Sequence, residues 1–302
     1  MKFEKPAFSV PDQIELLRRR GMMVADEARA QHYLRVISYY RLRAYWLPFE
    51  VPADSNGDHA FRDGTTFDDV LTLYIFDREL RLLVLDAIER VEVALRAQWA
   101  HHMAMTYGPH GYLDQGHYAH IQRHASAVAE LDKEFHRSRD TFASHYRDKY
   151  TSPRLPPVWM AAEVMSFGLL SKFYSDLKLR NDRKAIAAPF ALDERVVTSF
   201  AHHISHVRNI CAHHGRLWNK RFTVKMTAPK YPAKLPVAMR GADGRYLHNT
   251  LVMLDYLLAQ IAPDTEWKKR LIALIDGCPL AEPSSMGYPT DWRAKAAWKI
   301  RE

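Results

Sequence analysis

The stretch FDDVLTLYIFDRELRLLVLDAIERVEVALRAQWAHHMAM, residues 67–105, decides the fold. It contains no Pro or Gly, the two residues that most often interrupt a helix. Its apolar residues recur at steps of three and four, as on one face of an α-helix, and include Leu71, Tyr74, Ile75, Leu82, Leu85, Ile88 and Val91. At about 1.5 Å per residue, such a helix is far longer than the average globular helix. We therefore predict the central helix of a bundle, or two helices broken once.

Shorter helical signals lie on both sides of this stretch. Gly21 follows one of them, as Gly often follows a helix, and Asp26 is a residue type that caps a helix N-terminus. Loops are expected at 51–65 and 108–118, where turn-forming residues gather. The remaining helices are expected at residues 11–20, 26–40, 119–150, 158–179 with a break at Gly168, 193–214, 248–261 and 264–276. The sequence therefore predicts an all-α fold.

We expect one continuous domain with three parts. Residues 1–65 form an N-terminal helical region with the aromatic cluster SYYRLRAYWLPF at 38–49. Residues 66–277 form the helical core, and the basic, Pro-containing segment 216–247 is an extended excursion from it. Residues 278–302 form a tail whose aromatic side chains predict that it docks on the core.

The composition excludes several classes of protein. At 302 residues, with 47% hydrophobic and 26% charged residues, the chain can bury a core and is not of the disordered type. Its two cysteines, Cys211 and Cys278, are too few for a disulfide framework or a four-cysteine zinc site. The start MKFEKPAFSVPDQ lacks the apolar region of a signal peptide, and no apolar run reaches the roughly 18 residues that span a bilayer. We expect a cytoplasmic protein without a membrane partner.

The positive charge of the chain is concentrated in one segment. The net charge is +8, yet residues 195–242 contain no Asp or Glu. Nine basic residues lie there: Arg195, Arg208, Arg216, Lys220, Arg221, Lys225, Lys230, Lys234 and Arg240. Removing these nine from the chain's 43 Lys and Arg leaves 34, against 35 Asp and Glu. A basic segment interleaved with aromatic residues suits a polyanion with stackable bases, although a solvated basic face would have the same composition.

Familiar catalytic motifs are absent, and metal ligation is the weaker explanation of the histidines. The chain has no P-loop, dinucleotide-binding fingerprint, nucleophile elbow or zinc-helix motif. His202 and His206 are spaced as neighbours on a helix, and so are His117, His120 and His124. Neither set has a carboxylate neighbour at helical spacing. We therefore expect ordinary surface or core histidines, no metal site and no cofactor.

The remaining candidate is VRNICAHHGRLWN, residues 207–219, inside the basic segment. Asn209 and His213 are four residues apart and hence neighbours on a helix. Arg208 points about 140° away from His213 on an ideal helix, so its long side chain or a nearby helix end must bring it back. Arg96 and His101 have the same spacing as Arg208 and His213, but no Asn follows Arg96 and the pair lies outside the basic segment. We therefore interpret Arg96 and His101 as structural residues.

These residue types suit RNA cleavage by transesterification. A neutral imidazole can take the proton of a ribose 2′-hydroxyl near pH 7, and a guanidinium stabilises charge that develops on the phosphate. The amide of Asn209 can orient the imidazole or the scissile phosphate. The nucleophile belongs to the substrate, so no metal is required, and the products are a 2′,3′-cyclic phosphate and a 5′-hydroxyl.

A single histidine does not easily serve as both base and acid. A homodimer that brings two copies of the motif together would supply the second imidazole, and His214 is a possible participant within one chain. The alternative reading, about equally supported by the residues alone, is that Arg208 and His213 form a buried polar pair between helices.

The residues RNICAHHGRLWN at 208–219 resemble the Arg-x4–6-His motif of the HEPN superfamily, in the form found in Abi-like abortive-infection proteins. Four more segments resemble the same family in order: 38–49, 76–96, 155–177 and 286–299. The resemblance implies a HEPN-type helical bundle with additional N-terminal and C-terminal elements. It also implies dimerisation through the motif face and endoribonuclease activity in anti-phage defence.

Residue by residue, the resemblance gives the catalytic positions of the family to Arg208, Asn209 and His213. Glu89 and Glu163 lie in matched segments and are possible auxiliary residues, as is His214. The predicted RNA-binding residues are Arg216, Lys220, Arg221, Lys225, Lys230 and Lys234. Expected partners are RNA, a second copy of the chain, and an RNA or protein antitoxin. The alternative function is a non-catalytic RNA-binding regulatory protein that uses the same basic surface.

Overall fold

The computed structural model describes residues 2, 6–52 and 59–300, and these residues are helical wherever they are regular. They form thirteen α-helices and seven short 3₁₀ helices, and their only β-type pairings are three isolated bridges. The predicted all-α fold is confirmed. The chain divides into two compact units, one of Met1–Leu80 with Ala273–Glu282 and one of Arg81–Ile272 with Pro283–Glu302. The predicted boundaries at 65/66 and 277/278, and the HEPN-specific arrangement, stay predictions.

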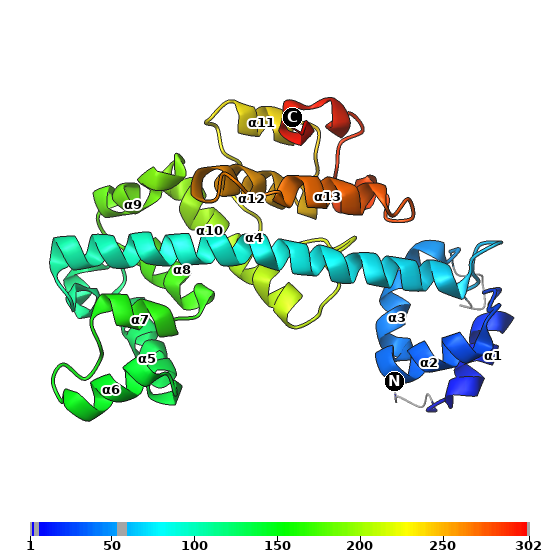
Figure 1. The fold of residues 1–302 in the computed structure, drawn as a ribbon, viewed down its shortest axis with the longest axis horizontal. Coiled ribbons are helices and arrows are strands. Elements are labelled where there is room, and N and C mark those ends of the chain that lie inside the picture. Colours follow the sequence, from blue (N-terminus) through cyan, green and yellow to red (C-terminus); the bar gives the residue numbers. More distant parts are fainter. Residues whose placement is uncertain (1, 3–5, 53–58, 301–302) are drawn as a thin grey trace. The chain divides into compact units, whose positions relative to one another are not determined.

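The first unit is built on helices that begin at side-chain caps. Its helices are α1 (Val10–Arg19), α2 (Glu27–Ile37), α3 (Tyr39–Trp46) and the first part of α4 (Figure 1). Asp26 caps α2 as predicted, accepting a hydrogen bond from the amide of Arg29 at 2.9 Å. The aromatic cluster forms the core here, because Trp46 is fully buried and the hydroxyl of Tyr45 donates to buried Asp77 at 2.6 Å. The predicted loop at 51–65 includes residues 53–58, which lie outside the described residues.

Helix α4 is one unbroken helix, Phe67–Tyr107. The alternative of two helices is therefore excluded. Its residues from Arg81 onward belong to the second unit, where Val91, Leu95 and Trp99 are buried. The indole nitrogen of Trp267 donates to the carbonyl of Leu83 at 2.7 Å and joins α13 to this helix. The buried side of α4 thus supplies a wall against which the rest of the second unit packs.

Nine more helices complete the structure: α5 (Ile121–Arg137), α6 (Thr141–Lys149), α7 (Val158–Val164), α8 (Phe167–Asp176), α9 (Arg180–Ala187), α10 (Glu194–Ala212), α11 (Lys234–Met239), α12 (Leu247–Ile261) and α13 (Trp267–Asp276). Helix α10 packs against α8 and α9, and α5 packs against α7 and α8 (Figure 1). In the C-terminal tail, Tyr288 and Trp298 are buried against the ring of His248 of α12, and buried Trp292 contacts both aromatic rings.

Four predicted helix boundaries are wrong, each for a local reason. The helix expected at 26–40 ends at Ile37, because Ser38 has φ +76° and its hydroxyl caps α3 by accepting from the amide of Arg41. The helix expected at 119–150 is two helices, because the chain is extended at Ser138, whose hydroxyl donates to Asp140 at 2.6 Å. The break expected at Gly168 lies earlier, where the Ser166 hydroxyl caps α8 by accepting from the amide of Leu169. Helix α13 begins at Trp267 and not at 264, since the Thr265 hydroxyl accepts the Trp267 amide. Helices α9 and α11 were not predicted, and α11 lies within the segment 216–247 that was expected to be an extended excursion.

Candidate functional site

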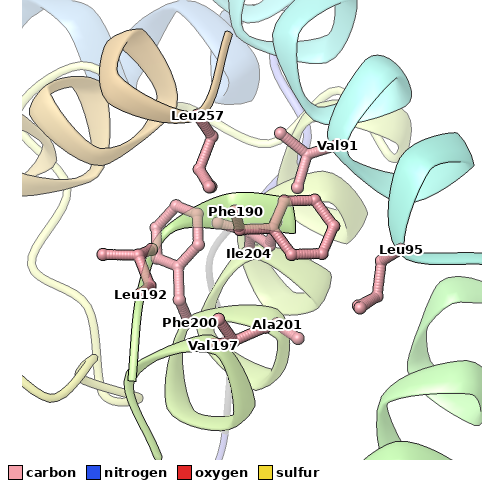
Figure 2. A pocket seen from close by; sticks show the side chains of 9 residues that line it. All are labelled: Val91, Leu95, Phe190, Leu192, Val197, Phe200, Ala201, Ile204 and Leu257. Carbon is pink, nitrogen blue, oxygen red and sulfur yellow. The ribbon is translucent and has the colours of Figure 1, made fainter. Parts of the chain in front are cut away.

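Helix α10 is fixed in the second unit by its apolar face. Phe200, Ala201 and Ile204 of this helix face Val91 and Leu95 of α4, with Leu257 of α12 beside them (Figure 2). The space left between these side chains is about 10 Å³, the volume of a single water-sized probe. This region is therefore packed core and not a ligand site, and it leaves the opposite face of α10 to the surface.

The outward face of α10 is one side of an open groove of about 450 Å³. His206, Asn209 and His213 lie along it, at positions that recur on one face of a helix. The other side is the coil segment 220–224. The full lining is His203, His206, Val207, Asn209, Ile210, His213, Lys220, Arg221, Phe222, Thr223 and Val224. The structure thus brings together two of the three predicted catalytic residues and two of the predicted RNA-binding residues.

His213 lies at the C-terminal end of α10, where it lines the groove. His213 is the C-cap, and its amide still donates to the carbonyl of Asn209 at 3.0 Å. His214 has φ +58°, which turns the chain away from the helix, and the amide of Gly215 closes the turn on Ile210 at 2.8 Å. His214 is exposed and is not among the groove residues, so the structure does not place this predicted auxiliary residue at the site.

The coil segment 220–224, the coil wall of the groove, is held to α10 by buried side chains. Phe222 is buried, and its amide donates to the carbonyl of Arg245 at 2.7 Å. His203, on the buried side of α10, bonds through Nδ1 to the carbonyl of Val224 and through Nε2 to the hydroxyl of Thr250, both at 2.8 Å. Burial lowers the pKa of His203, which favours the neutral ring that this pair of bonds requires. The width of the groove is therefore set by specific contacts.

The groove is suited to an anion. Lys220 and Arg221 line it, and no Asp or Glu is among the residues described as lining it. His206 is exposed, but the partial covering of its ring in the groove lowers its pKa, and the nearby charge of His202 lowers it further. Both effects favour the neutral form of His206 beside the two basic side chains across the groove.

Arg208 does not share the groove with Asn209 and His213. It is half-buried and is absent from the groove lining. Burial raises the pKa of Glu92 on α4, and the charges of Arg96 and Arg208 oppose that rise. Arg96 itself pairs with Glu92 at 2.6 Å. The charge of Arg208 thus acts on Glu92 of α4, and of the three predicted catalytic residues only Asn209 and His213 line the groove.

The other predicted auxiliary and RNA-binding residues lie outside the groove. Glu163 is exposed and its carboxylate is 4.0 Å from Arg96, and Glu89 is exposed on α4. Arg216 donates to the carbonyl of Asn219 at 3.3 Å. The ammonium of Lys234 lies 4.7 Å from the ring centre of Tyr256. Lys225 and Lys230 are exposed on the segment that follows the groove wall.

The histidines considered as metal ligands have separate partners. His117 stacks on Tyr107, His120 contacts Asp176 at 2.5 Å, and buried His124 lies 2.9 Å from the carbonyl of Tyr112. In the described part of the chain, no three His, Cys, Asp or Glu side chains gather as a metal site. Over the same residues, none of the helices combines the length and the apolarity that crossing a membrane would need.

Sequence reasoning missed His206 as a residue of the groove, because it was considered only as the partner of His202. The available signal was its spacing: His206 precedes His213 by seven residues, two helical turns.

The model of the Abi-like protein family matches residues 32–219, more than half of the chain. The match includes all of α10 and ends just before Lys220, so the coil wall of the groove lies beyond it. No curated protein and no solved structure matches the chain.

Proposed function

The chain belongs to the Abi-like protein family, and on that premise we propose that it is a metal-independent endoribonuclease of an abortive-infection system. RNA is the substrate, and cleavage uses the ribose 2′-hydroxyl as the nucleophile. The products are a 2′,3′-cyclic phosphate and a 5′-hydroxyl. The activity serves anti-phage defence, in which cutting RNA stops growth of the infected cell.

One observation carries this proposal: Asn209 and His213 open onto the same groove as Lys220 and Arg221. A polyanion is attracted to a groove with two cations and no carboxylate in its lining. The imidazole of His213 is positioned for proton transfer at a phosphodiester held there, and the amide of Asn209 can orient it. The alternative of a buried polar pair between Arg208 and His213 has less support, since His213 is exposed.

We assign Arg208 to the site of a second copy of the chain. Its charge acts on Glu92 of α4, and its side chain does not line the groove of its own chain. A homodimer in which the motif helices approach each other would bring the guanidinium of one protomer to the phosphate in the groove of its partner. An RNA or protein antitoxin that covers the groove would keep such an enzyme inactive until infection.

The test is cleavage of total RNA in EDTA by wild-type protein and by His213→Ala. Wild-type protein is expected to give fragments with 2′,3′-cyclic phosphate ends, and His213→Ala to leave the RNA intact while still binding it. His145→Ala, on the exposed face of remote α6, is the matched histidine control and should cut like wild type. Intact RNA with salt-sensitive binding by the wild type would overturn the nuclease and favour a non-catalytic RNA-binding regulator.

A further inference from the structure

We propose that His206 is a second catalytic residue, which takes the proton of the 2′-hydroxyl while His213 of the same groove protonates the departing 5′-oxygen. The inference rests on the proposed ribonuclease function and deepens it. It assigns both proton transfers to one chain, so that the dimer is needed for Arg208 and not for a second histidine.

The placement of the two histidines on α10 is the first support. Seven residues on an α-helix turn the chain through almost two full turns, so the side chains of His206 and His213 leave the same face, about 10 Å apart along the axis. Asn209 lies between them, and all three line the groove. A phosphodiester lying along this face therefore has an imidazole on each side and an amide beneath it.

The surroundings of His206 favour a proton acceptor. Val207 and Ile210 line the groove beside it, and His202 contacts it edge to face with ring centres 4.9 Å apart. The charged groups that face it from the opposite wall are Lys220 and Arg221, both cationic. No carboxylate in the groove lining stabilises a protonated His206 ring, and partial desolvation of this exposed ring and the charge of His202 both lower its pKa. A neutral imidazole is the form that a general base requires.

The position of His213 favours the complementary role. It is the C-cap of α10, the end of the helix at which the aligned peptide dipoles place partial negative charge. A protonated imidazole interacts favourably with this end of a helix. The acid is therefore placed at the helix end and the base two turns before it.

The step is balanced without any further reactant. The proton of the 2′-hydroxyl moves to the free nitrogen of His206 as the 2′-oxygen bonds to phosphorus. The bond from phosphorus to the 5′-oxygen breaks, and His213 gives its proton to that oxygen. His206 leaves the step protonated and His213 neutral, and exchange with water restores both.

The first experiment compares His206→Gln with His145→Gln on a short RNA substrate. His145 is the matched control, because it is an exposed histidine of α6 that neither lines the groove nor contacts His206. We expect His206→Gln to lose cleavage by about 10²- to 10⁴-fold with unchanged RNA affinity, the usual size of a general-base contribution. His145→Gln should stay within about threefold of wild type. The remaining activity of His206→Gln should lack the rise of rate with pH that titration of the base produces.

The second experiment separates the base from the acid. A substrate with sulfur in place of the 5′-oxygen has a leaving group that departs without a proton. This substrate should restore cleavage by His213→Ala and leave His206→Gln inactive. The reverse pattern would exchange the two roles and overturn the assignment. His206→Asn, with a circular dichroism spectrum of each variant, checks that the loss does not come from misfolding.

The outcomes separate this inference from the function on which it rests. Wild-type protein that leaves RNA intact overturns the ribonuclease, and with it the role of His206. Wild-type protein that cuts, together with His206→Gln that cuts equally well, overturns only the role of His206 and returns the second imidazole to the partner subunit.

Discussion

Nδ1 of His203 donates a hydrogen bond to the carbonyl of Val224, 2.8 Å away, and so joins the motif helix to the coil wall of the groove. The other ring nitrogen accepts from the hydroxyl of Thr250 on α12 at the same distance. One buried neutral ring therefore connects three segments that are far apart in the sequence. The groove depends on this ring, which has no part in the proposed reaction.

Replacing His203 with Ala should lower the free energy of unfolding by about 3 kcal/mol, because a cavity forms and two buried polar partners lose their bonds. The amide of Phe222 should also exchange faster with solvent, since the wall that carries it is released. Urea unfolding and hydrogen exchange measure the two effects. His202→Ala, on the exposed side, should stay within about 0.5 kcal/mol of wild type. Unchanged exchange at Phe222 would contradict this role of His203.

Lys220→Ala and Arg221→Ala should each weaken RNA binding and lower the slope of log affinity against log salt by about 1, as expected for loss of one phosphate contact. Lys234→Ala is the matched comparison, because the Lys234 ammonium lies over the ring of Tyr256 and not in the groove. Its slope should change less. Binding of a labelled RNA over a salt series gives the slopes, and equal slopes for all three variants would count against the groove as the RNA site.

Mixing inactive Arg208→Ala protein with inactive His213→Ala protein should restore cleavage. Each mixed dimer has one intact groove that receives Arg208 from its partner, so random exchange yields about a quarter of the wild-type rate. Mixing His213→Ala with His206→Gln is the control and should stay inactive, because both imidazoles belong to one groove. The absence of recovery in the first mixture, with exchange of subunits verified, would place Arg208 in its own chain's site.

Acid should weaken the docking of the C-terminal tail. Trp298 donates to Nε2 of His248 at 3.2 Å, and burial lowers the pKa of His248 to about 4 from an unfolded value of 6.5. Between these values the unfolded chain binds more protons, so stability is complete above pH 6.5 and falls towards pH 4, by about 3 kcal/mol from this group. Urea unfolding at several pH values should show a smaller loss in His248→Gln. An equal loss in both proteins would exclude His248 as the cause.

Much of the fold could be predicted from local signals in the sequence. Asp26 and Asp193 mark helix starts, and the absence of Pro and Gly over 67–105 indicates one long helix. The breaks at Ser138 and Ser166 were missed because serine caps a helix only when the chain bends there, and the residue type alone does not reveal the bend.

The candidate site could be predicted from the sequence only in part. Asn209 and His213 share a helical face, and that follows from spacing. The groove needs the coil at 220–224 to fold back on α10, a contact between residues 21 apart that no local pattern indicates. The electrostatic interaction of Arg208 with Glu92 depends likewise on how α10 packs on α4.

The two walls of the groove are different structural elements. Asn209 and His213 are on helix α10, which is fixed by its apolar face, and Lys220 and Arg221 are on a coil that lies beyond the residues matched by the family model. If the proposed function holds, changes in the coil alter which RNA is held without displacing the side chains proposed to cut it. The substrate of such an enzyme could then be changed by exchanging one short segment, as long as the hydrogen bond to His203 is kept. An engineer could graft the coil of one relative onto another by the same logic.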